Sequence, residues 1–332
     1  RICLVGSEMC IRDRSSYVLI DPKGSAKNLL SIYSFFAINF ESLFLYIGFG
    51  VLVFLVVIAF SKSGSRKIVL EGRSNYSYFS WYSMLFATGM GAALLYWSTY
   101  EWLVYYTNPI EGEDQSLLKA RSYPLFHWMF TGWALYILPT VAFVFSLMKN
   151  PNTPLTFSGI LLKEQSGPIR ILLDIFFIGA ILTGAGVGLA LSFPLMSAAI
   201  SKLFGLNQTI YLDFVMLLIC MCIVSISVYR GLQNGIKKLS NFNIILVISF
   251  LTLILITGPT KYIVINTFEP VTYVLKNYLS LSLLKSQYSL DWTVFYWAWY
   301  IALAPAVGAF IVNISNNKTC LLYTSDAADE VL

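Results

Sequence analysis

Five of the eight tryptophans in this chain fall in two short apolar runs, HWMFTGWALY at 127–136 and WTVFYWAWY at 292–300. Both runs lie in stretches long enough to cross a bilayer. Aromatic residues at the ends of membrane spans are common interfacial anchors. Rings stacked several turns deep on two separate spans could instead form a cage for a diffuse cation such as a quaternary ammonium, because ring faces attract cations. The choice between these interpretations depends on the helices that carry the two runs.

The composition indicates a polytopic membrane protein. Hydrophobic residues make up 57% of the 332 residues and charged residues only 12%, with a mean hydropathy of +0.70, whereas soluble domains carry about 25% charged residues. The net charge of +5 is small and spread along the chain, so nucleic-acid binding is not indicated. With one histidine and no cluster of histidines and carboxylates in a span, neither an enzyme nor a bound cofactor is expected. The apolar stretch at 291–313 has no lysine for a Schiff base, which argues against a retinal protein.

The two ends of the chain predict segments that are foreign to the protein. The peptides MCIRD at 9–13 and CLLYT at 320–324 can be encoded by the two strands of one DNA sequence. We interpret 1–14 and 320–332 as translated sequencing adapters that flank a natural segment at 15–319. Of the five cysteines, Cys220 and Cys222 then remain, and two positions apart on a helix they do not face each other, so no disulfide is expected.

Apolar stretches of about 20 residues predict seven membrane spans. They lie at 39–61, 79–106, 123–147, 172–201, 210–229, 240–258 and 291–313. Because basic residues favour the cytoplasmic side, the loops at 62–78, 148–171 and 230–239 are assigned to the cytoplasm. The loop at 259–290 is then external, and a short surface helix is expected around Val271–Leu284. The predicted location is the plasma (inner) membrane, with multiple passes.

Two spans contain residues that weaken a helix. The span at 79–106 carries Gly89-Met90-Gly91, and the span at 291–313 carries Ala304-Pro305-Ala306-Val307-Gly308. Small residues also allow close packing between membrane helices. The alternative, which we favour from the spacing of the two segments, is a pair of unwound segments whose free backbone groups hold an ion and a substrate, as in inverted-repeat transporters.

Five motifs in consistent order resemble the betaine/choline/carnitine transporter family. They are SWYSMLFATGMGAALLYW at 80–97, YPLFHWMFTGWALY at 123–136, GLQNGIKKLSNFN at 231–243, ITGPT at 256–260 and DWTVFYWAWYIALAPAVGAFI at 291–311. The resemblance covers nearly all of 25–316. It implies an all-α polytopic membrane protein with the inverted-repeat (LeuT-like) transporter fold, about seven of whose twelve transmembrane helices are present.

The resemblance also implies a division of the chain. An external segment, the second leading helix and a cytoplasmic loop occupy 15–78, and the first five-helix repeat occupies 79–258. The external loop at 259–290 follows, and 291–319 holds the first helix of the second repeat.

The resemblance implies a central substrate cage built from rings of two spans, beside the glycine-broken helix. Its residues are Gly89, Gly91, Trp128, Trp133, Tyr136, Trp297, Trp299 and Tyr300. On one unbroken helix the three rings of the 123–147 span would cover an arc of about 140°, a concave wall. Tyr300 and Leu303 stand where members of the family commonly have tryptophan.

The implied function is secondary active import of a quaternary-ammonium or sulfonium osmolyte, such as glycine betaine or choline, by alternating access. Sodium is the expected coupling ion, held by backbone oxygens near Ala87 and Met90. Sodium-independent carnitine exchangers carry an arginine where Asn243 stands, so Asn243 indirectly favours a sodium site. A sodium-independent carnitine/betaine exchanger of the same fold remains the alternative. The expected partners are the onium solute, membrane lipid and, by the family resemblance, two further copies in a homotrimer.

Overall fold

The computed structural model describes residues 20–62, 64, 74–89, 92–109, 114–162 and 167–319, which form helices and no β-sheet. The helices are α2 (Pro22–Phe60), α3 (Tyr78–Gly89), α4 (Ala92–Thr107), α5 (Leu117–Trp128), α6 (Phe130–Lys149), α7 (Phe157–Leu161), α8 (Pro168–Phe204), α9 (Ile210–Tyr229), α10 (Lys237–Thr257), α11 (Thr260–Ser282) and α12 (Val294–Ile314). Two π-helical turns, η1 (Leu232–Ile236) and η2 (Ser289–Thr293), precede α10 and α12. The predicted adapters at 1–14 and 320–332 lie outside the described residues.

Among the described residues, six helical segments are long and apolar enough to cross a membrane. They are Pro22–Phe60, Leu117–Lys149, Pro168–Phe204, Ile210–Tyr229, Leu232–Thr257 and Ser289–Ile314. Six of the seven predicted spans correspond to them. The seventh, at 79–106, is described in two parts, α3 up to Gly89 and α4 from Ala92. The two residues between them, Met90 and Gly91, lie outside the described part of the chain.

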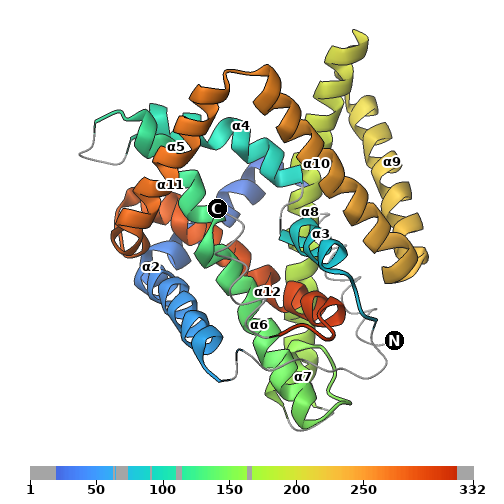
Figure 1. Ribbon diagram of the computed structural model, residues 1–332. Helices are drawn as coiled ribbons and strands as arrows, with labels where there is room; N and C mark the ends of the chain where they lie inside the picture. Colours follow the sequence, from blue (N-terminus) through green and yellow to red (C-terminus); the bar gives the residue numbers. More distant parts are fainter. Residues whose placement is uncertain are drawn as a thin grey trace.

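The central contact of the fold joins α6 and α12, which lie side by side in the middle of the molecule (Figure 1). Gly132 faces the ring of Tyr300, and Gly308 faces Pro139 and the backbone of Thr140. Eight residues separate Gly132 from Thr140, and eight separate Tyr300 from Gly308. The two helices therefore run in the same direction, in a register fixed by glycines that leave no room for a side chain.

The predicted break at Ala304–Gly308 is wrong for this structure, because α12 is a continuous helix from Val294 to Ile314. Proline inside a membrane helix is tolerated when neighbouring groups satisfy the freed backbone. The small residues here serve close packing instead: a Cβ on Gly308 would lie 2.9 Å from Pro139 Cβ and from Thr140 N. The alternative interpretation of these residues, close helix packing, is the one that the structure confirms for α12.

The helix predicted in the external loop is longer than expected. It runs from Thr260 to Ser282 as α11 rather than starting near Val271. In Figure 1, α10 and α11 meet at the top of the view, and α11 descends beside α5. Arg121 of α5 donates from its guanidinium to the side chain of Asn266 and, at 2.9 Å, to the hydroxyl of Tyr262. These contacts hold α11 against the helix that carries Trp128.

The far end of α12 is fixed to the start of α3. The indole Nε1 of Trp81 donates to Ser315 Oγ at 2.9 Å. The ammonium of Lys318 donates to the carbonyl of Tyr76 at 3.0 Å and lies 3.8 Å from the ring centroid of Tyr78. Burial lowers the pKa of Lys318, and the ring and the carbonyl replace part of the water that this cation has lost.

Replacing Gly308 by alanine should destabilise the protein, because its new Cβ would collide with backbone and ring atoms of α6 that cannot move aside. Overpacking of this kind costs about 1–3 kcal/mol. Gly50→Ala in α2 is the matched control, since no atom lies within 4 Å of a Cβ there. Thermal unfolding of the detergent-purified protein should show a lower midpoint for Gly308→Ala and no loss for Gly50→Ala. Equal midpoints would contradict the packing described here.

Candidate functional site

A cavity of about 440 Å³ lies beside the α6–α12 contact and is bordered by seven helices, α3, α4, α5, α6, α8, α9 and α12. Its wall contains Thr88, Gly89, Trp97, Trp128, Tyr136, Ala185, Gly188, Leu189, Ser192, Cys220, Met221, Val224, Phe295, Tyr296, Trp299, Tyr300 and Leu303. Its volume falls within the range of about 300–1,000 Å³ that is usual for small-ligand sites. None of the described residues of this wall is charged, so a charged ligand would have to be held there by rings and dipoles.

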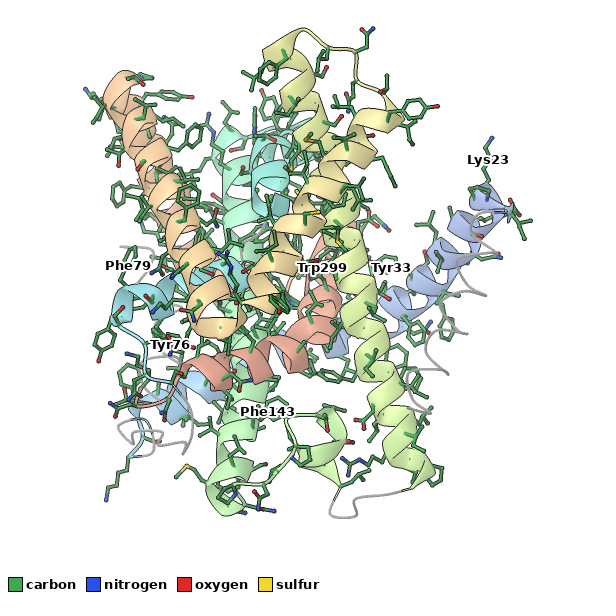
Figure 2. All side chains as sticks on the ribbon, turned by 90° about the vertical axis from the view of Figure 1, so that its right-hand side faces the viewer. Lys23, Tyr33, Tyr76, Phe79, Phe143 and Trp299 are labelled. Atoms are coloured by element: carbon green, nitrogen blue, oxygen red, sulfur yellow. The ribbon has the colours of Figure 1, made fainter. Side chains whose placement is uncertain are left out.

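Four of the six predicted cage rings border this cavity: Trp128, Tyr136, Trp299 and Tyr300. The rings of Tyr136 and Tyr300 meet edge to face, with their centroids 4.9 Å apart and their planes at 75° to each other. Trp128 stands edge to face with Tyr300 at 6.5 Å. Figure 2 shows Trp299 where α12 lies beside α8. The two aromatic runs of the sequence therefore meet around one space.

The other two predicted rings lie elsewhere. Trp297 is buried in the core, with 1% of its surface exposed, and its indole contacts the rings of Phe126 and His127. Its Nε1 edge fits against Gly48 of α2. Trp133 packs edge to face on Tyr136 at 6.3 Å, and its ring occupies the space where Gly89 would carry a Cβ. Neither indole belongs to the cavity wall, so their role is to support the rings that do.

The helix that carries the first aromatic run is broken at Met129, where α5 ends and α6 begins. The predicted arc of Trp128, Trp133 and Tyr136 assumed one unbroken helix and is therefore wrong. Trp128 is the last residue of α5, and the other two rings belong to α6. The break gives Trp128 an orientation of its own, which a regular helix would not allow.

Tyr278 of α11 satisfies the backbone at this break. The N–H of Thr131 donates to the Tyr278 hydroxyl at 3.1 Å, and Thr131 Oγ1 lies 2.6 Å from the same oxygen. A break inside a membrane requires such partners, because lipid offers none. Burial raises the pKa of Tyr278 to about 12, so its hydroxyl stays neutral at physiological pH and makes both contacts. These contacts thus link α11 to the break between α5 and α6.

A buried polar network lies behind Trp128. The carboxylate of Glu101, on α4, accepts a hydrogen bond from Trp128 Nε1 at 3.1 Å and from the Tyr105 hydroxyl at 2.6 Å. His127 Nδ1 lies 3.6 Å from the same carboxylate, and His127 Nε2 lies 3.1 Å from Thr293 Oγ1. Glu101 and His127 are fully buried. The network links α4, α5 and η2.

The predicted ion-binding residues are only partly placed. Ala87 lies in α3, two residues before Gly89, the last described residue of this helix. Asn243 is exposed on α10 and does not belong to the cavity wall. Met90 and Gly91 lie outside the described residues. Gly89 does border the cavity.

Several residues of the wall were missed by the sequence analysis. Phe295 and Tyr296 sit in the same aromatic run as the predicted residues but were not among the rings assigned to the cage, and Tyr296 stands 5.7 Å from Trp128, edge to face. Cys220, Met221 and Val224 come from α9, whose sequence is uniformly apolar, so no periodic signal marks the side that faces the cavity.

The fold and the site together define a multi-pass membrane protein with an uncharged aromatic cavity at its centre. Residues 6–320 match the family described as BCCT, betaine/carnitine/choline family transporter. The chain belongs to this family, which is one of transporters and not of enzymes, and it is a multi-pass protein of the plasma membrane.

Named relatives from several bacteria share this similarity. The chain is 28% identical to a carnitine transporter of Acinetobacter baumannii over 284 residues, which cover 82% of this chain and 52% of the relative. It is 32% identical to a glycine betaine/proline/choline/ectoine transporter of Vibrio parahaemolyticus over 323 residues, 92% of this chain and 57% of the relative. It is 30% identical to a high-affinity choline transport protein of Escherichia coli over 284 residues, 81% of this chain and 42% of the relative. The chain thus spans about half the length of the curated relatives that it matches.

Cys220 and Cys222 provide a test of the cavity. Cys220 borders it, whereas Cys222 is exposed on the apolar outer surface of α9. A thiol reacts only where water and reagent can reach it. In a variant whose other three cysteines are serine, the water-soluble reagent trimethylammonium-ethyl methanethiosulfonate should label Cys220 faster than Cys222, as measured by mass spectrometry. Faster labelling of Cys222 would contradict the cavity.

Proposed function

We propose that this chain carries the substrate cage of a secondary active transporter that imports a quaternary-ammonium or sulfonium osmolyte, such as glycine betaine or choline. The observation that carries the proposal is the cavity bordered by Trp128, Tyr136, Trp299 and Tyr300, whose described wall residues are all uncharged. Its relatives named as carnitine, choline and glycine betaine transporters support the same ligand class.

The chemistry of an onium head suits this cavity. A methylated ammonium has no N–H donor, so a carboxylate in the wall would lose its own water without gaining a hydrogen bond. A ring face attracts the same cation and loses little water in doing so, contributing about 0.5–2 kcal/mol for each well-placed ring. Several faces around one space therefore favour a bulky methylated cation over both a primary amine and a hydrated metal ion.

We also propose that the transport is coupled to sodium and proceeds by alternating access within a LeuT-like inverted-repeat fold. The ion site is supported by the position of Gly89, the last described residue of α3, in the wall of the cavity. A glycine-interrupted helix beside the substrate cavity is the arrangement that inverted-repeat transporters use for coupling ions.

A sodium-independent carnitine/betaine exchanger is the alternative. One observation favours it: the exposed position of Asn243 on α10 removes the argument that this side chain marks a sodium site in place of an arginine. Both functions use the aromatic cavity. In the importer sodium moves together with the substrate, whereas in the exchanger a second substrate molecule moves in the opposite direction.

Tyr136 provides the sharpest test of the cage. Tyr136→Ala removes a ring face and should raise the Michaelis constant for labelled glycine betaine by about tenfold or more, if the ring contributes up to about 2 kcal/mol. Tyr136→Phe keeps the face and should change the Michaelis constant by less than about threefold. The uptake is measured in cells that express the complete gene encoding this chain. Equal uptake by Tyr136→Ala and the unchanged protein would overturn the cage.

The coupling ion is tested by the same uptake assay. Replacing external sodium by potassium at constant ionic strength should abolish net import, because the ion gradient drives the cycle. Uptake that continues without sodium, and that accelerates when the cells are preloaded with unlabelled substrate, would instead identify the exchanger. In either case the Tyr136 variants test substrate binding in the cage independently of which ion drives the transport.

A further inference from the structure

Glu101 is a buried anion that borders the space on the far side of the Trp128 indole. Trp128 borders both the central cavity and a second cavity of about 410 Å³, whereas Glu101 borders only the second one. The carboxylate has no exposed surface. An isolated buried carboxylate is strongly disfavoured, so its partners decide what it does.

Both oxygens of Glu101 accept hydrogen bonds, as those of a carboxylate do. The Tyr105 hydroxyl donates to Oε1 at 2.6 Å. The Trp128 indole donates to Oε2 at 3.1 Å. The imidazole of His127 lies 3.6 Å away, on the residue before Trp128, and Tyr296 also interacts with this carboxylate. One oxygen is thus held in place by Tyr105, and the other is available to the cage tryptophan.

We propose that Glu101 is a positioning residue that strengthens the attraction of the cage for a cation through the Trp128 indole. A ring attracts a cation because its face is electron-rich. An N–H that donates to a full negative charge polarises the indole and makes its face more negative than donation to a neutral oxygen would. The bond also orients the indole plane of Trp128, the last residue of α5 before the helix break at Met129.

This inference rests on the proposed function and adds a specificity to it. The carboxylate makes the cage prefer a positively charged ligand to a neutral ligand of the same size. It does so without touching the ligand. The arrangement keeps the cavity wall uncharged, so a ligand enters without having to displace water from an anion.

Glu101→Gln tests the inference with little change of shape. The amide oxygen of glutamine can accept from Trp128 Nε1, and its N–H can donate to the Tyr105 hydroxyl, so both contacts survive and the negative charge is lost. The affinity for choline should fall by about fivefold, a loss within the range that a single cation–ring contact contributes, because the indole face becomes less negative. The affinity for the carbon isostere of choline, in which tert-butyl replaces trimethylammonium, should stay the same. Both are measured as inhibition of labelled glycine betaine uptake.

The outcomes separate charge from structure. Equal weakening of choline and its isostere, or no weakening of either, would overturn the inference, because a merely structural carboxylate affects both ligands alike. In a Trp128→Phe background, where the N–H is absent, the additional effect of Glu101→Gln should disappear, and an undiminished effect would mean that the carboxylate acts directly rather than through the indole. Glu269→Gln, a charge removal on the exposed face of α11, is the matched control and should change neither affinity.

Failure of the proposed function would look different. If the unchanged protein takes up no glycine betaine and is not inhibited by choline, the transport proposal fails and the inference fails with it. If the unchanged protein is inhibited by choline and Glu101→Gln behaves identically, the transport proposal stands and the role of Glu101 alone is refuted.

Discussion

The close, parallel packing of α6 on α12 is the constraint on which the rest of the structure depends. Gly132 admits the ring of Tyr300, and Gly308 admits the backbone of α6 around Thr140. Side chains at these positions would push the helices apart and with them the two aromatic runs. Because the helices run in the same direction, rings at matching heights face one another. The uncharged cavity follows from this register and not from the aromatic composition alone.

A second feature, the break at Met129, gives the site its asymmetry. A continuous helix would have placed Trp128 on the same rigid surface as Trp133 and Tyr136. With α5 ending at Trp128, this indole is oriented by a carboxylate on α4, while the start of α6 is held by the hydroxyl of Tyr278 on α11. The polar groups buried around the cage thus satisfy backbone and indole N–H groups that lipid would leave without partners.

The sequence predicted an all-helical membrane protein, because apolar length is a strong signal, and six of the seven predicted spans have counterparts among the described helices. The cage rings were indicated by the family resemblance, and four of the six border one cavity; their role in binding stays a prediction. Prediction from the sequence failed where helix geometry departs from regularity: nothing local marks a break at Met129, and Pro305 suggested a break that close packing removes. It also could not distinguish Trp297, which lies in the core, from Trp299, which borders the cavity, since both sit in one run. The division into repeats at 79–258 and 291–319 stays a prediction.

The central claim is that ring faces from two helices replace water around a methylated cation. A cryo-electron microscopy map of the protein with glycine betaine tests this most directly. The account predicts density for the trimethylammonium group inside the cavity, against the faces of Trp128, Tyr136, Trp299 and Tyr300. Density for the ligand at a carboxylate, or rings collapsed on one another with the ligand elsewhere, would contradict it.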